Sequence, residues 1–136
     1  MSTPDPAEMA SLVSEWRDLL ARHAATTCAL DRELGERHGL GMSEFEVLER
    51  LVESPCEDGT SLRVQELSGM VHLSQSALSR LIGRLEKAGL VERVMCEQDR
   101  RGIYVSLSQA GRERYEAARP THRAVLARIL TAGQPA

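Results

Sequence analysis

The residues of this chain best suited to chemistry are short polar and cationic side chains that recur along one stretch, from Leu73 to Leu90. They are Ser74, Gln75, Ser76, Ser79, Arg80, Arg84 and Lys87. Hydroxyl and amide groups can hydrogen-bond the edges of bases, and Arg and Lys can bind phosphate oxygens. These residue types in this order are typical of a helix that lowers its first turns into the major groove of DNA. The alternative is the solvated face of an ordinary surface helix.

The same stretch has the pattern of a single amphipathic helix. Its apolar residues recur at helical spacing on one face: Leu78, Leu81, Ile82 and Leu85. Ser74 is predicted to cap the start of this helix, because its hydroxyl can accept a hydrogen bond from a first-turn amide. Gly89 is predicted to end it, since glycine adopts positive φ without strain. The polar side chains therefore share the outer face.

A shorter helix is predicted just upstream, over about residues 64–70. His72 and Leu73 form the turn that separates it from the amphipathic helix that Ser74 caps. Two short helices joined by a tight turn, the second with an exposed polar face, make a helix-turn-helix.

A β-hairpin is predicted directly downstream. Apolar and polar residues alternate over 91–96, with Val91, Arg93 and Met95 on one face, and again over 103–107. The polar segment EQDRRG joins the two strands and gives the hairpin a cationic tip. Adjacent arginines repel each other unless Asp99 or an external phosphate neutralises them. A hairpin of this kind after a helix-turn-helix is a winged helix.

Long helices are predicted on both sides of the winged helix. A near-heptad apolar pattern over about 7–37 predicts one helix whose stripe needs cover from the chain's last helix or from a partner subunit. The next helix is predicted to start at Ser43, which with Glu46 has the spacing of a capping box. The last helix is predicted over 108–130, kinked or split by Pro120. The predicted fold class is therefore mainly α with a small β-hairpin.

Length and composition predict a single domain over residues 1–136, with the winged helix at about 43–107. A hydrophobic content of 42% and a charged content of 27% are typical of a globular protein. No apolar run is long enough to span a membrane, and no signal peptide is recognisable. Three scattered cysteines without a CxxC motif favour reduced thiols in the cytoplasm.

The net charge of −3 argues only weakly against a nucleic-acid partner, because the charge is unevenly distributed. Residues 1–62 hold five arginines and thirteen acidic residues, whereas residues 63–136 hold twelve Arg and Lys and seven acidic residues. Phosphates respond to the local field, so a basic region can bind double-stranded DNA within an acidic chain.

From about residue 10 to residue 130 the chain resembles the MarR family of bacterial transcriptional regulators. Three motifs carry the resemblance: the core VQELS…LSQSALSRLIGRLEKAGLVER, the wing motif DRRG, and VSLSQAGRE at the start of the last helix. The resemblance implies a homodimer, held by the helices at about 7–37 and 108–130, that binds a pseudo-palindromic operator. It also implies a regulator, a repressor or an activator, that a small molecule or an oxidant usually releases. The family usually has one further helix, before which this chain stops.

The resemblance assigns roles to individual residues. Arg101, beside Arg100, matches the wing arginine that enters the minor groove, whose negative potential favours a guanidinium. Asp99 matches the acid that holds the wing in place, and Arg84 is its expected partner. Gln75, Ser76, Ser79 and Arg80 match positions that face base edges and nearby phosphates.

Other functions are weighed against DNA binding. No catalytic motif, metal-spaced cluster or cofactor-binding loop is recognisable, so an enzyme is not expected. A protein-binding winged helix gains little from Arg100 and Arg101. Redox sensing through Cys28 is a further alternative, disfavoured because Cys28 lies in mid-helix, far from the helix dipole's positive end. Effector-lining candidates, each also explained as core or interface, are Trp16, His23, Met42 and Met70.

Overall fold

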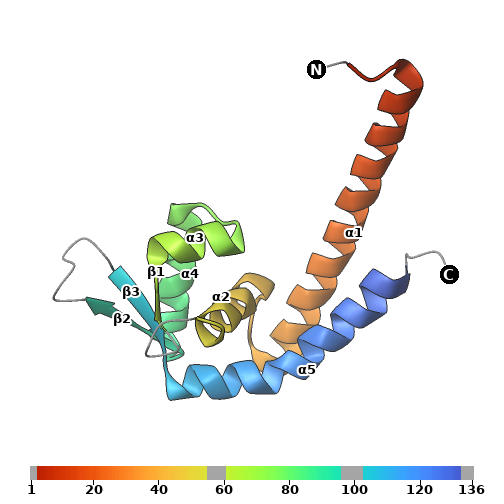
Figure 1. Cartoon of the computed structure of the whole chain (residues 1–136). Helices are drawn as coiled ribbons and strands as arrows, with labels where there is room; N and C mark the ends of the chain where they lie inside the picture. The colour runs from red at the N-terminus through yellow and green to blue at the C-terminus, as the bar shows by residue number, and fades with distance from the viewer. Residues whose placement is uncertain (1–2, 55–60, 96–102, 133–136) are drawn as a thin grey trace.

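The computed structural model describes residues 3–54, 61–95 and 103–132 (Figure 1). In chain order the elements are α1 (Pro6–His38), α2 (Met42–Val52), β1 (Ser61–Arg63), α3 (Val64–Val71), α4 (Gln75–Lys87), β2 (Val91–Met95), β3 (Ile103–Leu107) and α5 (Gln109–Ala132). In Figure 1 the sheet lies with α3 and α4 at one side and α1 at the other, with α2 between them, while α5 runs along the bottom from the sheet to α1. The predicted fold class, mainly α with a small hairpin, is confirmed.

The predicted helix-turn-helix is present as α3 and α4. His72 takes a left-handed conformation (φ 57°) that ends α3, and the Ser68 hydroxyl donates to the Leu73 carbonyl across the turn at 2.8 Å. The Ser74 hydroxyl accepts from the Ala77 amide at 3.2 Å, so Ser74 caps α4 as predicted. Gly89, with φ 77°, ends the helix region, also as predicted.

The predicted hairpin is part of a three-stranded antiparallel sheet in the order β1-β3-β2. Leu62 pairs with Val105, and Val91 pairs with Leu107. Leu62, Val91 and Val105 are buried against the helices, so this face of the sheet completes the core. The segment before α3 was predicted only as a short extended stretch, and its pairing with β3 makes it the third strand.

The start of α5 is fastened to the end of α4 and the start of β2. The Ser108 amide donates to the Leu90 carbonyl at 3.1 Å, and its hydroxyl donates to the Gly89 carbonyl at 2.7 Å. The same hydroxyl accepts from the Gly111 amide at 3.0 Å, which makes Ser108 the cap of α5. A Cβ on Gly111 would overlap the Leu90 carbonyl oxygen and lie 2.8 Å from Leu107 Cδ1. Only glycine therefore fits this contact.

The start of α2 differs from the prediction. The helix begins at Met42, with Gly41 as its cap, and not at Ser43. The Gly41 amide donates to the Glu44 carboxylate at 2.7 Å, and the Met42 amide donates to Asp31 Oδ1 on α1 at 2.8 Å. A carboxylate from another helix thus satisfies the first amide of α2, and the helix begins before the predicted Ser43 cap.

Helix α5 continues through Pro120, so the predicted split does not occur, although the helix changes direction along its length in Figure 1. Contacts with α1 support it on both sides of the proline. Before Pro120, Arg114 donates to the His38 carbonyl at 3.0 Å. After it, the Thr121 hydroxyl lies 2.9 Å from His38 Nε2 and Arg128 pairs with Glu33. These bonds hold the helix across the position where Pro120 lacks an amide.

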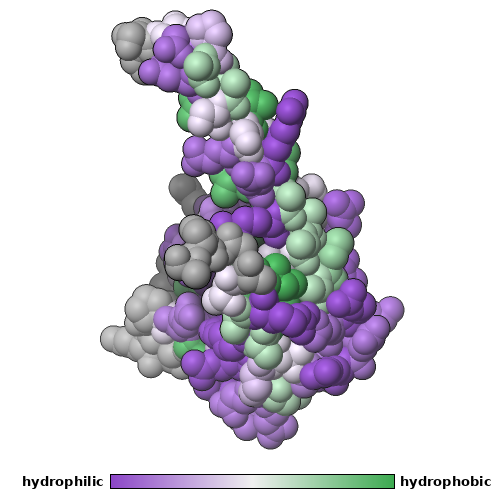
Figure 2. All heavy atoms as spheres, turned by 90° about the vertical axis from the view of Figure 1, so that its right-hand side faces the viewer, coloured by the Kyte–Doolittle hydropathy of each residue, from purple (hydrophilic) through white to green (hydrophobic). Residues whose placement is uncertain are grey.

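The N-terminal half of α1 projects away from the rest of the chain (Figure 1). Its apolar side chains are between 36% and 58% exposed: Met9, Leu12, Val13, Trp16, Leu19 and Leu20. We call these six residues the α1 seam. Figure 2 shows apolar side chains on this projecting part of the molecule. The chain's last helix thus covers only the second half of the predicted apolar stripe, at Leu30 and Leu34.

A polar cluster joins α2 to α5 and was not anticipated from the sequence. Glu49 on α2 accepts from the Tyr115 hydroxyl at 2.7 Å and from Arg123 Nη2 at 2.6 Å. Arg123 Nη1 donates to His122 Nδ1 at 2.6 Å, and the His122 ring stacks on Phe45 with centroids 4.2 Å apart. An arginine can only donate, so the His122 proton lies on Nε2, 3.6 Å from the Glu46 carboxylate.

Burial and hydrogen bonding oppose each other in this cluster. Burial of Glu49 disfavours its charge, but the hydrogen bonds from Arg123 and Tyr115 outweigh that cost and lower its pKa. Burial and the bond to Glu49 raise the pKa of Tyr115 to about 12. Glu49 is therefore ionised at neutral pH and joins α2 to α5 by charge-assisted hydrogen bonds.

Gly111→Ala is expected to lower the free energy of unfolding by about 2 kcal/mol or more, because the added methyl group forces α5 away from the Leu90 carbonyl. Gly69→Ala is the matched control: a Cβ there meets no atom within 4 Å, and replacing a helical glycine should stabilise by up to about 1 kcal/mol. Urea denaturation of both variants measures the difference. Equal stability of Gly111→Ala and the wild type would contradict the contact.

The Glu49 cluster predicts an acid-sensitive fold. Because the pKa of Glu49 is lower in the folded chain, its stabilisation is present above the unfolded pKa and is lost as pH falls below about 5. Glu49→Gln should cost about 1–3 kcal/mol at pH 7 and flatten the loss of stability between about pH 5 and 3. Glu53→Gln, on the exposed end of the same helix, should leave the pH profile of the wild type.

Candidate nucleic-acid interface

The first turns of α4 present the polar face that the sequence predicted. The predicted base-reading side chains are all exposed: Gln75, Ser76, Ser79 and Arg80. The Ser74 hydroxyl is partly committed, since it caps the helix and lies 3.3 Å from the Ser76 hydroxyl. For Ser74 the capping role is thus visible in the free protein, whereas Gln75 and Arg80 have side chains available for a ligand.

Three cations follow along the same helix, at spacings of four and three residues. Arg80, Arg84 and Lys87 are exposed, and none forms an ion pair or hydrogen bond with any residue that the structure describes. Like charges at helical spacing destabilise a helix slightly. Three unpaired cations in one row can instead bind a run of phosphates, which neutralises them.

Gly83 lies beside this row, in the interior of α4. A Cβ at Gly83 would meet no atom within 4 Å, so the fold of the chain does not require glycine there. Glycine lowers helix stability by about 0.5–1 kcal/mol relative to alanine. The bare backbone leaves open space between the Ser79 and Glu86 turns of the helix.

Arg93 on β2 is a residue that the sequence analysis did not single out. It pairs with Val105 and shares the core-facing side of the sheet, as the predicted alternation required. Its guanidinium reaches α4, with Nε 3.4 Å from Glu86 Oε1 and Nη2 3.5 Å from the Ser79 carbonyl. A charged residue on the inward face of a strand was the signal that could have identified it.

The tip of the wing lies outside the described residues. Asp99, Arg100 and Arg101 were predicted to form it, so the Asp99–Arg84 pair and the minor-groove role of Arg101 stay predictions. The strands that lead to the tip are described. Toward the tip they leave the core, since Ile103, on the same face as the buried Val105, is 46% exposed.

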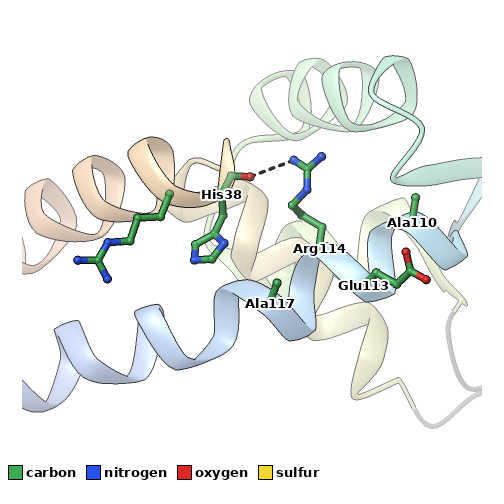
Figure 3. Close-up of a pocket in the computed structure, with 6 residues that line it drawn as sticks. His38, Ala110, Glu113, Arg114 and Ala117 are labelled. Atoms are coloured by element: carbon green, nitrogen blue, oxygen red, sulfur yellow. Dashed lines mark hydrogen bonds between the residues drawn. The ribbon is translucent and has the colours of Figure 1, made fainter.

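Two hollows lie on the side of the flanking helices. One, of about 550 Å³, is lined by Arg37, His38, Ala110, Glu113, Arg114 and Ala117 (Figure 3). Arg114 donates to the His38 carbonyl there at 3.0 Å, which satisfies the end of α1. The other, of about 440 Å³, lies between α2 and α5 and is lined in part by Tyr115, Arg119 and Arg123.

The effector-lining candidates line neither of these hollows. Trp16 and His23 are exposed on α1, whereas Met42 and Met70 are half-buried on α2 and α3. Cys28 is exposed on α1, and Arg32, one turn further on, lies 3.9 Å from the Glu33 carboxylate. Redox sensing through Cys28 stays an untested alternative.

Within the described ranges, no group of three or more His, Cys, Asp and Glu side chains could hold a metal ion. His122 is buried against Phe45, and the other histidines lie apart from one another on α1 and at the end of α3. No described helix is long and apolar enough to cross a membrane.

A known protein family and several solved structures are similar to this chain. The model of the MarR family matches residues 40–103, from the turn after α1 to the start of β3. AbsC, a MarR family transcriptional regulator from Streptomyces coelicolor, is 31% identical, with a TM-score of 0.80 over 99% of this chain and 86% of that one. Sco3205 from the same organism, solved in complex with DNA, is 27% identical, with a TM-score of 0.83 over 99% and 81% of the two chains.

A curated relative is the homoprotocatechuate degradative operon repressor of Escherichia coli. It is 30% identical over 100 residues, which are 74% of this chain and 63% of that protein. The chain spans between 45% and 63% of the length of the curated relatives that it matches. The likeness to AbsC, by contrast, covers 99% of this chain and 86% of AbsC, and so extends over the helix-turn-helix, the strands and the flanking helices of this chain. The chain belongs to the MarR family of transcriptional regulators.

Proposed function

We propose that this protein is a sequence-specific DNA-binding transcriptional regulator that acts as a homodimer. The observation that carries the proposal is the outer face of α4, where polar side chains at the helix start precede three exposed, unpaired cations. Helix α4 enters the major groove, and Arg101 of the wing enters the minor groove. The similar Sco3205, solved with DNA, supports this assignment.

The winged helix and the flanking helices take different roles in this proposal. The winged helix over about 43–107 binds DNA, and α1 with α5 forms the dimer interface. The α1 seam supports the second role, because Trp16, Leu19 and their neighbours expose a continuous apolar stripe that a second copy can bury. A symmetric dimer places two copies of α4 about one DNA turn apart, which matches a pseudo-palindromic operator.

We propose a repressor, by analogy with the Escherichia coli relative. Release by a small molecule stays an expectation, and the hollow between α2 and α5 is the place we favour for it. Arg119 and Arg123 could bind an anionic group there, beside the ring of Tyr115. A titration of the DNA complex with small organic acids would test this site. No catalysis is proposed, and the chain would act in the cytoplasm, on chromosomal DNA.

DNA binding predicts a steep salt dependence. A duplex selected by the wild-type protein from a random-sequence pool should be bound less tightly by Arg101→Ala. The slope of log K against log salt should fall by about one unit, because one phosphate-type contact is lost. Arg80→Ala should instead relax preference at particular base pairs, by about 1–3 kcal/mol each.

Fluorescence anisotropy over a range of salt concentrations measures these affinities. Arg50→Ala, which removes an arginine of α2 outside the proposed surface, is the charge-matched control and should keep the wild-type slope. A folded Arg101→Ala protein with unchanged affinity would remove Arg101 from the site. Failure of the wild type to select any duplex would contradict the proposed function.

Dimerisation through the α1 seam is predicted to bury Trp16, the chain's only tryptophan, which is 58% exposed in a single chain. Leu19→Glu should raise the dissociation constant about 100-fold or more, since each buried Leu contributes about 1.5–3 kcal/mol and symmetry counts it twice. Ser14→Glu adds the same charge on the opposite side of the helix and should leave the dimer intact. Sedimentation measures the dissociation constant of each variant, and the Trp16 emission wavelength reports whether Trp16 is buried. A wild-type monomer at micromolar concentration would contradict the interface.

A further inference from the structure

Among the described residues of the β2–β3 hairpin, the buried apolar side chains lie at its base. Val91 and Val105 are buried, and Leu62 on β1 lies beside Val105. Beyond this point the hairpin leaves the core, since Ile103, on the same face of the sheet as the buried Val105, is 46% exposed. Where the described strands leave the core, a side-chain contact with α4 can therefore set the angle between the hairpin and α4.

Arg93 lies where this hairpin leaves the core. Its side chain crosses to α4, where Nε meets the Glu86 carboxylate at 3.4 Å and Nη2 meets the Ser79 carbonyl at 3.5 Å. Among the described residues of β2, Arg93 is the one whose side chain bonds to α4. The two acceptors are seven residues apart, so the Arg93 guanidinium spans about two turns of α4.

We propose that Arg93 and Glu86 form a positioning pair that fixes the angle between the wing and α4. The pair lets α4 reach the major groove while the wing reaches the minor groove. Both residues act through others: Glu86 orients Arg93, and Arg93 holds the hairpin that carries Arg101. This inference rests on the proposed DNA-binding function.

The charge of Glu86 supports a positioning role. Glu86 lies on the helix that carries Arg80, Arg84 and Lys87, and its carboxylate is 44% exposed. A carboxylate at this surface repels phosphates and lowers affinity for DNA. That cost is offset if the carboxylate holds Arg93, and through it the wing, in the binding geometry.

The pair has little to do with the stability of the fold. The side chains of Arg93 and Glu86 are 36% and 44% exposed, and half-exposed ion pairs contribute little to folding. Variants of either residue should therefore fold, and their DNA affinity can be measured directly.

The decisive variant is Glu86→Gln, because the two possible roles of Glu86 predict opposite changes in affinity for DNA. If the carboxylate only repels phosphates, its removal raises affinity for DNA. If it positions the wing, its removal lowers affinity, by about threefold to tenfold. We expect the second result, measured by anisotropy on a duplex that the wild type has selected from a random pool, and we expect Arg93→Gln to match it.

Glu92→Gln is the matched control. Glu92 is exposed on β2, next to Arg93 but on the other face of the sheet, and its carboxylate bonds to no residue that the structure describes. Its loss should leave affinity unchanged or slightly higher. In an Arg101→Ala background, Glu86→Gln should have no further effect, because the wing contact that it positions is already gone.

Each outcome decides between the alternatives. Equal or tighter binding by folded Glu86→Gln overturns the inference and leaves the proposed function standing. A loss with Arg93→Gln alone, with the salt slope lower by about one, would instead make Arg93 a direct phosphate contact. Failure of the wild type to select any duplex overturns both proposals. Thermal unfolding of each variant confirms that the fold is intact.

Discussion

The backbone of Leu90 is the point on which the arrangement of this protein depends. Its amide donates to the Leu85 carbonyl at 2.9 Å and closes α4, and its carbonyl accepts from the Ser108 amide at the start of α5. Gly111 packs directly against that carbonyl. Three elements therefore meet at Leu90: the end of α4, the beginning of β2 and the beginning of α5. Any larger residue at Gly111 would separate them.

A second joint fixes the other end of this frame. Glu49 on α2 binds Tyr115 and Arg123 on α5, and His122 stacks on Phe45 of α2. With α5 tied both to α4 and to α2, the flanking helices hold a set position relative to the winged helix. Two surfaces of the described residues then bind no other described part of the chain, a polar and cationic one on α4 and the apolar α1 seam. Phosphates suit the first, and a second copy suits the second.

The departures from the sequence-based predictions have physical reasons. The capping pattern at Ser43 was sound by local rules, but the Asp31 carboxylate reaches the Met42 amide from α1, and the helix starts earlier. Pro120 was expected to kink or split α5; the helix bends but does not split, because bonds to α1 on both sides of Pro120 keep it whole. In both places a contact between residues far apart in sequence outweighs a local preference.

The sequence alone determined the elements of the winged helix, because spacing along the chain encodes them: the Ser74 cap, the apolar face of α4, Gly89 and the alternation of the two strands. It also indicated the polar face of α4, since residues on a helix share a face at fixed intervals. Only the tertiary structure decided which side chains meet across elements. Glu49 and Arg123 are 74 residues apart, and Arg93 and Glu86 lie on different kinds of element. No periodicity relates such partners, because their distance depends on how the whole chain packs.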